Sequence, residues 1–147
     1  MEQYVFQGIG FAVHLVAAVV WIGGLASLVV GLRPALNRAI VAVDERDRVW
    51  AAIHRRFVLV ASLAAAILLA SGFMMMTADP HFKGFGDYSN AWSKLLVVKH
   101  GLFVLMLLVL LALRKPRDAK AERDLVDISL MLGIAVLVVT GLLTAIE

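Results

Sequence analysis

Residues 14–24 read His-Leu-Val-Ala-Ala-Val-Val-Trp-Ile-Gly-Gly and lie inside the first long apolar stretch of the chain, residues 4–32. This stretch is long enough for a membrane-spanning helix, which needs roughly 20 apolar residues. On a helix, where successive residues are turned by about 100°, one side collects Gln7, Gly10, His14, Ala17, Ala18 and Trp21. These side chains are small or weakly polar, so we expect room for a ligand beside the imidazole.

The opposite side of the same stretch carries small residues at every fourth position: Gly23, Ser27 and Gly31. Small residues at this spacing allow a second helix to approach closely in a membrane. We therefore expect this side to pack against another helix, either within the chain or in a partner subunit or second copy.

The composition indicates an integral membrane protein. Hydrophobic residues make up 62% of the 147 residues, and the mean hydropathy is +0.91. Apolar stretches of spanning length cover residues 4–32, 50–76, 92–113 and 125–146. Short connections favour an all-α, up-down-up-down four-helix bundle in the lipid bilayer, with residues 1–147 as one domain. In this topology the first and third helices lie diagonally across the core.

The distribution of positive charge predicts the orientation. Eleven of the 14 Lys and Arg residues flank the first and third connections, and the middle connection holds only Lys83. By the positive-inside rule, both termini lie on the non-cytoplasmic side of a bacterial inner membrane. Pro34 and Pro116 are expected to mark the ends of the first and third helices on the basic side. Membrane orientation explains these charges, so they do not indicate nucleic-acid binding.

Two histidines lie well inside the apolar stretches. His100 is eight residues from Trp92, or about 12 Å along a helix, and His14 is ten residues from Tyr4, or about 15 Å. Similar depth on diagonal helices favours a b-type haem with one imidazole on each face of the iron. Lys94 and Lys99 would receive the propionates. The chain would then serve in electron transfer or as a subunit of a redox complex.

The residues leave other metals and other functions open. The chain has no cysteine, which excludes thiolate sites, iron–sulfur clusters and covalent c-type haem. Imidazole and thioether both bind Cu(I), so His14 and His100 with Met74, Met75 and Met76 would also suit copper. His54 is expected at the basic membrane surface, where Arg56 is a candidate partner of Asp127. His81 is expected in the middle connection. A structural subunit without a metal is a further interpretation.

The chain resembles the copper-resistance D (CopD) family of bacterial inner-membrane proteins. The matching features are His14, Trp21-Ile-Gly-Gly24, Arg56-Phe57 at the start of the second helix, Gly72 near its end, and Lys99. The resemblance covers nearly the whole chain and implies copper movement across the membrane. A more distant resemblance, carried by His14 and Lys99, is to HemJ-type protoporphyrinogen oxidases. It implies a haem enzyme, although residues 125–129 depart from the oxidase motif. Whether the chain is an enzyme is left open.

Overall fold

The computed structural model describes residues 2–78, 91–115 and 118–145, and the regular structure in these ranges is entirely helical. A first rod runs through five consecutive helical segments: α1 (Glu2–Ala18), η1 (Val19–Gly23), α2 (Gly24–Ala26), η2 (Ser27–Leu32) and α3 (Arg33–Ala39). Three further helices follow: α4 (Val43–Ala78), α5 (Ala91–Leu113) and α6 (Ala119–Ala145).

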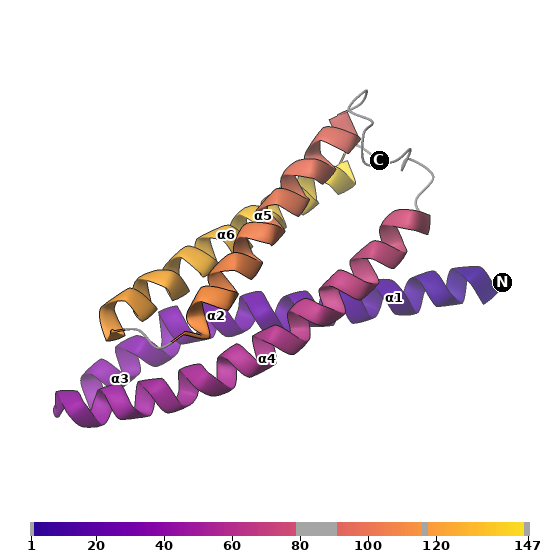
Figure 1. Cartoon of the computed structure of the whole chain (residues 1–147). Helices are drawn as coiled ribbons and strands as arrows, with labels where there is room; N and C mark the ends of the chain where they lie inside the picture. Colours follow the sequence, from indigo (N-terminus) through magenta and orange to yellow (C-terminus); the bar gives the residue numbers. More distant parts are fainter. Residues whose placement is uncertain (1, 79–90, 116–117, 146–147) are drawn as a thin grey trace.

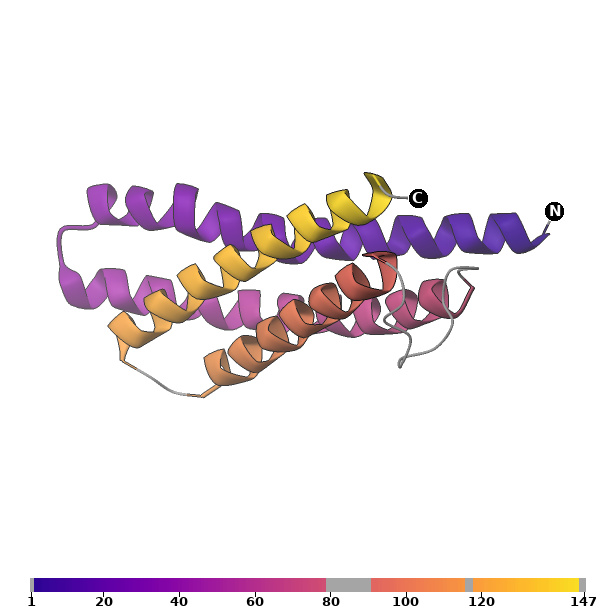
Figure 2. The same cartoon turned by 90° about the horizontal axis from the view of Figure 1, so that it is seen from above.

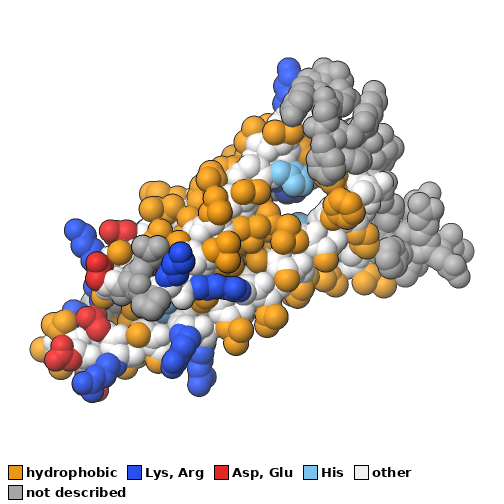
Figure 3. All heavy atoms as spheres, in the orientation of Figure 1, with side chains coloured by type: hydrophobic (Ala, Val, Ile, Leu, Met, Phe, Trp, Pro, Cys, Tyr) orange, Lys and Arg blue, Asp and Glu red, His pale blue; other side chains and the backbone are white. Residues whose placement is uncertain are grey.

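Each of the four rods can cross a membrane. Their most apolar windows have mean hydropathies between 2.4 and 2.6, and most residues in these windows are not buried inside the chain. Apolar side chains accordingly cover the visible surface of the rods, while Lys and Arg gather at one end (Figure 3). The predicted all-α membrane fold is confirmed. We call the end that holds α3 and the start of α4 the basic end, and the opposite end the loop end.

The rods form two helical hairpins. The first rod packs along α4, and α5 packs along α6. Contacts of α4 with α5, and of α6 with η1 and α2, join the two hairpins into a ring. This order places the first rod diagonally opposite α5, as predicted. The hairpins lie together at the basic end and diverge towards the loop end (Figure 1), and in the view from above α5 and α6 overlap α4 and the first rod (Figure 2).

The core between the hairpins is packed around the middle of the first rod. Trp21, which is 1% exposed, meets Phe103 of α5 edge to face, with ring centroids 5.8 Å apart. A Cβ atom at Gly133 would lie 3.2 Å from Ile22, so this glycine allows α6 to approach the first rod closely. Gly24 does the same for Phe57 of α4, whose ring would lie 2.8 Å from an added Cβ.

The first rod contains two π-helical segments that the sequence analysis does not predict, η1 and η2. In a π-helix each backbone hydrogen bond spans five residues instead of four. Pro34 lies in the first turn of α3, directly after η2, where a proline is tolerated because its missing N–H costs little. The rod therefore continues to Ala39. The prediction that Pro34 ends the helix is wrong, and Pro116 lies outside the described residues.

The side of the first rod that carries Gly23, Ser27 and Gly31 faces away from the bundle. All three residues are exposed. Among the described residues, nothing lies within 4 Å of a Cβ built on Gly31, and Gly23 meets only Val19 of its own rod. The prediction that this side packs against another helix of the same chain is therefore wrong. A contact with a partner subunit or second copy stays a prediction.

Candidate metal centre

The imidazole of His14 is held against α4 in a defined orientation. Its Nδ1 lies 2.9 Å from Oγ of Ser71, and this hydroxyl donates to the carbonyl of Ile67 at 2.6 Å. A hydroxyl has one proton to donate, so when Ser71 donates to Ile67 its oxygen accepts from Nδ1–H of His14. In neutral imidazole the other nitrogen, Nε2, then carries the lone pair. This is the arrangement of a metal-binding histidine, whose second nitrogen donates to a fixed acceptor.

Small residues and a thioether surround this imidazole. A Cβ atom added to Gly72 would lie 3.3 Å from Cε1 of His14, so the glycine lets the ring lie directly on α4. One turn from His14, Gly10 leaves the space that the methyl group of Met74 occupies. Met76 is also buried, and Met75 is half-buried. The predicted side of the first rod is confirmed for Gly10, His14 and Ala17 of α1 and for Trp21 of η1, which all face the bundle.

The candidate residues of α5 differ in how far they are buried. Lys99 is half-buried and lies within electrostatic range of His14. His100 is exposed, and its Nδ1 lies 2.7 Å from the carbonyl of Leu96 in its own helix. Lys94 is exposed. The hydrogen bond of His14 is to Ser71 of α4, and that of His100 is to Leu96 of its own helix. Neither contact joins the two histidines, so a haem held by both of them stays a prediction. His81 lies outside the described residues.

A hollow lies between the diverging hairpins. In the space-filling view, histidine side chains line this hollow, with a Lys or Arg side chain beside them (Figure 3). Within the described residues, no group of three or more His, Cys, Asp or Glu side chains could hold a metal ion. A metal held here would therefore depend on imidazole and thioether donors rather than on carboxylates.

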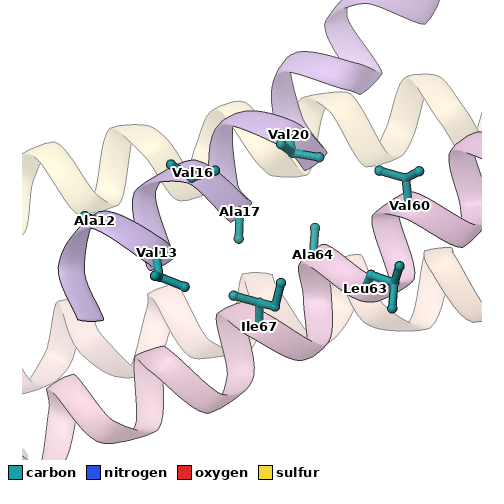
Figure 4. A pocket seen from close by; sticks show the side chains of 9 residues that line it. All are labelled: Ala12, Val13, Val16, Ala17, Val20, Val60, Leu63, Ala64 and Ile67. Atoms are coloured by element: carbon teal, nitrogen blue, oxygen red, sulfur yellow. The ribbon is translucent and has the colours of Figure 1, made fainter. Parts of the chain in front are cut away.

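A separate groove of about 360 Å³ lies between the first rod and α4 and is lined by apolar side chains from both (Figure 4). Its lining residues are Ala12, Val13, Val16, Ala17, Val20, Val60, Leu63, Ala64 and Ile67. None of these side chains has a nitrogen, oxygen or sulfur atom. The groove therefore has no metal ligand, and in a bilayer it faces hydrocarbon chains.

A second polar cluster lies at the basic end. Arg33 of α3 forms a two-pronged ion pair with Asp127 of α6, at 3.0 and 2.8 Å, and Arg123 of α6 pairs with Asp47 of α4 at 2.7 Å. The expected partner of Asp127, Arg56, is exposed instead. Arg33 reaches Asp127 because α3 continues the first rod beyond Pro34 alongside α6.

His54 belongs to this cluster and is not an exposed surface residue. It is 5% exposed, and its Nδ1 lies 3.2 Å from Oε1 of Glu122 on α6. The indole of Trp50 donates to the same oxygen at 2.7 Å, and Arg33 lies over the Trp50 ring at 5.7 Å. The contacts of His54 and Trp50 with Glu122 are not predicted from the sequence. The spacing of Trp50 and His54 could have indicated them, because residues four positions apart share one face of α4.

Comparison with known proteins finds a relative among bacterial copper proteins. This chain aligns with the copper transport protein CutJ of Bacillus subtilis at 31% identity in an alignment of 141 positions that covers 90% of this chain. CutJ is CopD-like. The chain is a distant homologue of this CopD-like protein. The resemblance predicted from His14, the Trp21–Gly24 segment and Lys99 is thus confirmed.

The aligned region spans 24% of the length of CutJ, so this chain corresponds to about a quarter of that relative. No family model matches the chain. No solved structure matches it either. The relationship to CutJ therefore comes from the sequence alignment.

Proposed function

We propose that this CopD-like chain moves copper across a bacterial inner membrane, with Cu(I) as its substrate and Nε2 of His14 as the first protein ligand. The observation that supports this most strongly is the 2.9 Å contact of His14 Nδ1 with the Ser71 hydroxyl. With this hydroxyl donating to the Ile67 carbonyl, Nδ1 carries the proton and Nε2 presents a lone pair. The homology with a copper transport protein favours copper as the metal.

The donor set favours the singly charged ion. Imidazole and thioether are ligands that Cu(I) accepts, and Met74 provides a thioether one turn from His14. Lys99 lies within electrostatic range of the imidazole. Because Coulomb repulsion scales with the product of charges, this ammonium disfavours a divalent ion twice as strongly as a monovalent one. Lys99 therefore supports selection of Cu(I) over divalent metals.

The path of the substrate follows from the shape of the bundle and from the positive-inside rule. The hollow that holds the histidines lies away from the basic end, where most of the Lys and Arg side chains gather (Figure 3). With the basic end in the cytoplasm, this hollow faces the outside. Copper would then enter from the non-cytoplasmic side and meet Met74 and His14.

Purified protein in detergent provides the test. Cu(I) is titrated in competition with a coloured chelator, using wild type, His14→Ala, Met74→Leu and, as a matched control, Met131→Leu, whose side chain is exposed on α6. We expect His14→Ala to abolish tight binding, Met74→Leu to weaken it and Met131→Leu to have no effect. Unchanged binding by His14→Ala would refute the proposal.

A visible spectrum of the same preparations separates copper from haem. Sharp α and β bands in the reduced protein, lost in both His14→Ala and His100→Ala, would establish the bis-histidine haem instead. A colourless protein whose Cu(I) binding depends on His14 and not on His100 supports copper as the substrate.

A further inference from the structure

The cluster at the basic end joins the two hairpins where they lie closest. The ion pair of Arg33 with Asp127 connects the first rod to α6, and the pair of Asp47 with Arg123 connects α4 to α6. The hydrogen bond from Trp50 to Glu122 and the close contact of His54 with the same carboxylate add a further α4–α6 link. Each of these contacts crosses from one hairpin to the other.

A packed apolar layer lies between this cluster and His14. Trp21, Leu25 and Met106 are at most 1% exposed, and Phe103 covers the edge of the Trp21 ring. Beyond this layer the hairpins diverge (Figure 1). The apolar layer and the polar cluster therefore separate the hollow beside His14 from the basic end.

Some buried polar atoms at the basic end have no hydrogen-bond partner. In the part of the chain that the structure describes, Nε2 of His54 and Nε of Arg33 are buried without a hydrogen-bond partner, as is Nε of Arg46 beside the cluster. Nε1 of Trp21, in the apolar layer, has no partner either. Buried polar atoms without partners oppose the closed arrangement, because they would regain hydrogen bonds in contact with water. This pattern favours contacts that close and open.

We infer that the cross-hairpin cluster of Arg33, Asp47, Trp50, His54, Glu122, Arg123 and Asp127 is a gate, which closes the basic end while the His14 site is open to the loop end. The gate opens when α6 separates from α3 and α4 and these side chains become hydrated. This inference rests on the proposed transport function, since a gate at the basic end is useful only if a substrate passes through the bundle.

Because the natural chain has no cysteine, single cysteines can report on access from either side. Two reporters are buried near the middle of the bundle, Ala61→Cys on α4 and Ser129→Cys on α6, and are 0% and 1% exposed. Full-length protein in vesicles of both orientations is treated with a membrane-impermeant maleimide. Ala42→Cys, in the exposed connection between α3 and α4, identifies which vesicles present the basic end.

We expect both reporters to be protected from the basic end in the natural sequence. Asp127→Asn and Glu122→Gln should each raise their labelling from that end by about tenfold, because each removes charge-assisted hydrogen bonds that hold the closed state. Asp124→Asn is the matched control, since Asp124 is exposed on the same helix. It should leave labelling unchanged.

The charge reversal Arg33→Asp with Asp127→Arg separates gating from misfolding, because it should restore protection if the pair itself closes the gate. The inference is overturned if the reporters are already labelled from the basic end in the natural sequence, if neither gate variant increases labelling, or if Asp124→Asn increases it equally. Labelling requires no copper. The gate can therefore fail while His14-dependent copper binding stands, and copper binding can fail while the gate stands.

Discussion

Replacing Ser71 by alanine removes one oxygen atom and, with it, the acceptor that holds Nδ1–H of His14 at 2.9 Å. The imidazole can then rotate or change tautomer, so that Nε2 no longer presents its lone pair at a fixed place. Loss of such a supporting partner typically weakens metal binding by about 10- to 100-fold, which corresponds to about 1.4–2.7 kcal/mol. This range agrees with the cost of about 1–3 kcal/mol for leaving a buried donor unpaired.

Competition titration of Cu(I) measures this loss directly, and Ser62→Ala is the control. Ser62 donates to a carbonyl of its own helix, Val58 at 2.6 Å, as Ser71 does to Ile67, but it makes no contact with His14. Both variants lose a hydroxyl on α4, and only Ser71→Ala should lose affinity. If Ser71→Ala binds Cu(I) within twofold of the natural protein, or if Ser62→Ala weakens binding equally, the assignment of the His14 tautomer is refuted.

Three further outcomes are expected. Gly24→Ala should lower the free energy of unfolding by about 1–3 kcal/mol, because its Cβ would meet the Phe57 ring at 2.8 Å; Gly31→Ala, with open space around it, should not. Thermal unfolding in detergent compares the two, and equal melting temperatures would contradict the packing argument. Ser27→Leu should disturb association with a partner subunit or second copy while sparing copper binding; an unchanged profile on gel filtration would leave this side facing only lipid. A reporter fused after the last residue should be active outside the cytoplasm, and activity confined to the cytoplasm would reverse the proposed orientation.

The sequence predicts the four spans and the side of α1 that faces the bundle because both depend on local patterns. Spanning length and hydropathy identify each rod, and helical periodicity places His14 beside Ala17 and Trp21. The CopD resemblance is likewise carried by short local motifs. These features need no knowledge of how the rods are arranged.

The contacts between rods were not predictable in the same way. Arg33 and Arg56 are both plausible partners of Asp127 from charge alone, and only the continuation of α3 beyond Pro34 brings Arg33 to α6. His54 lies beside arginines in the sequence, yet its burial depends on Glu122, which is 68 positions away. Ser71 is one of several serines in apolar helices, and its role follows only from its distance to His14.

The π-helical segments of the first rod also affect how this chain tolerates changes in length. A ring closed over five residues holds one residue more than an α-helical ring. Deleting one residue within η1 could therefore be absorbed by a return to α-helical winding, with little displacement of the residues on either side. The same deletion in the middle of α5, which is α-helical throughout, would turn every following side chain by about 100°. In related chains, length variation in this part of the sequence is thus expected to concentrate at η1 and η2, which lie between His14 and Arg33 of the first rod.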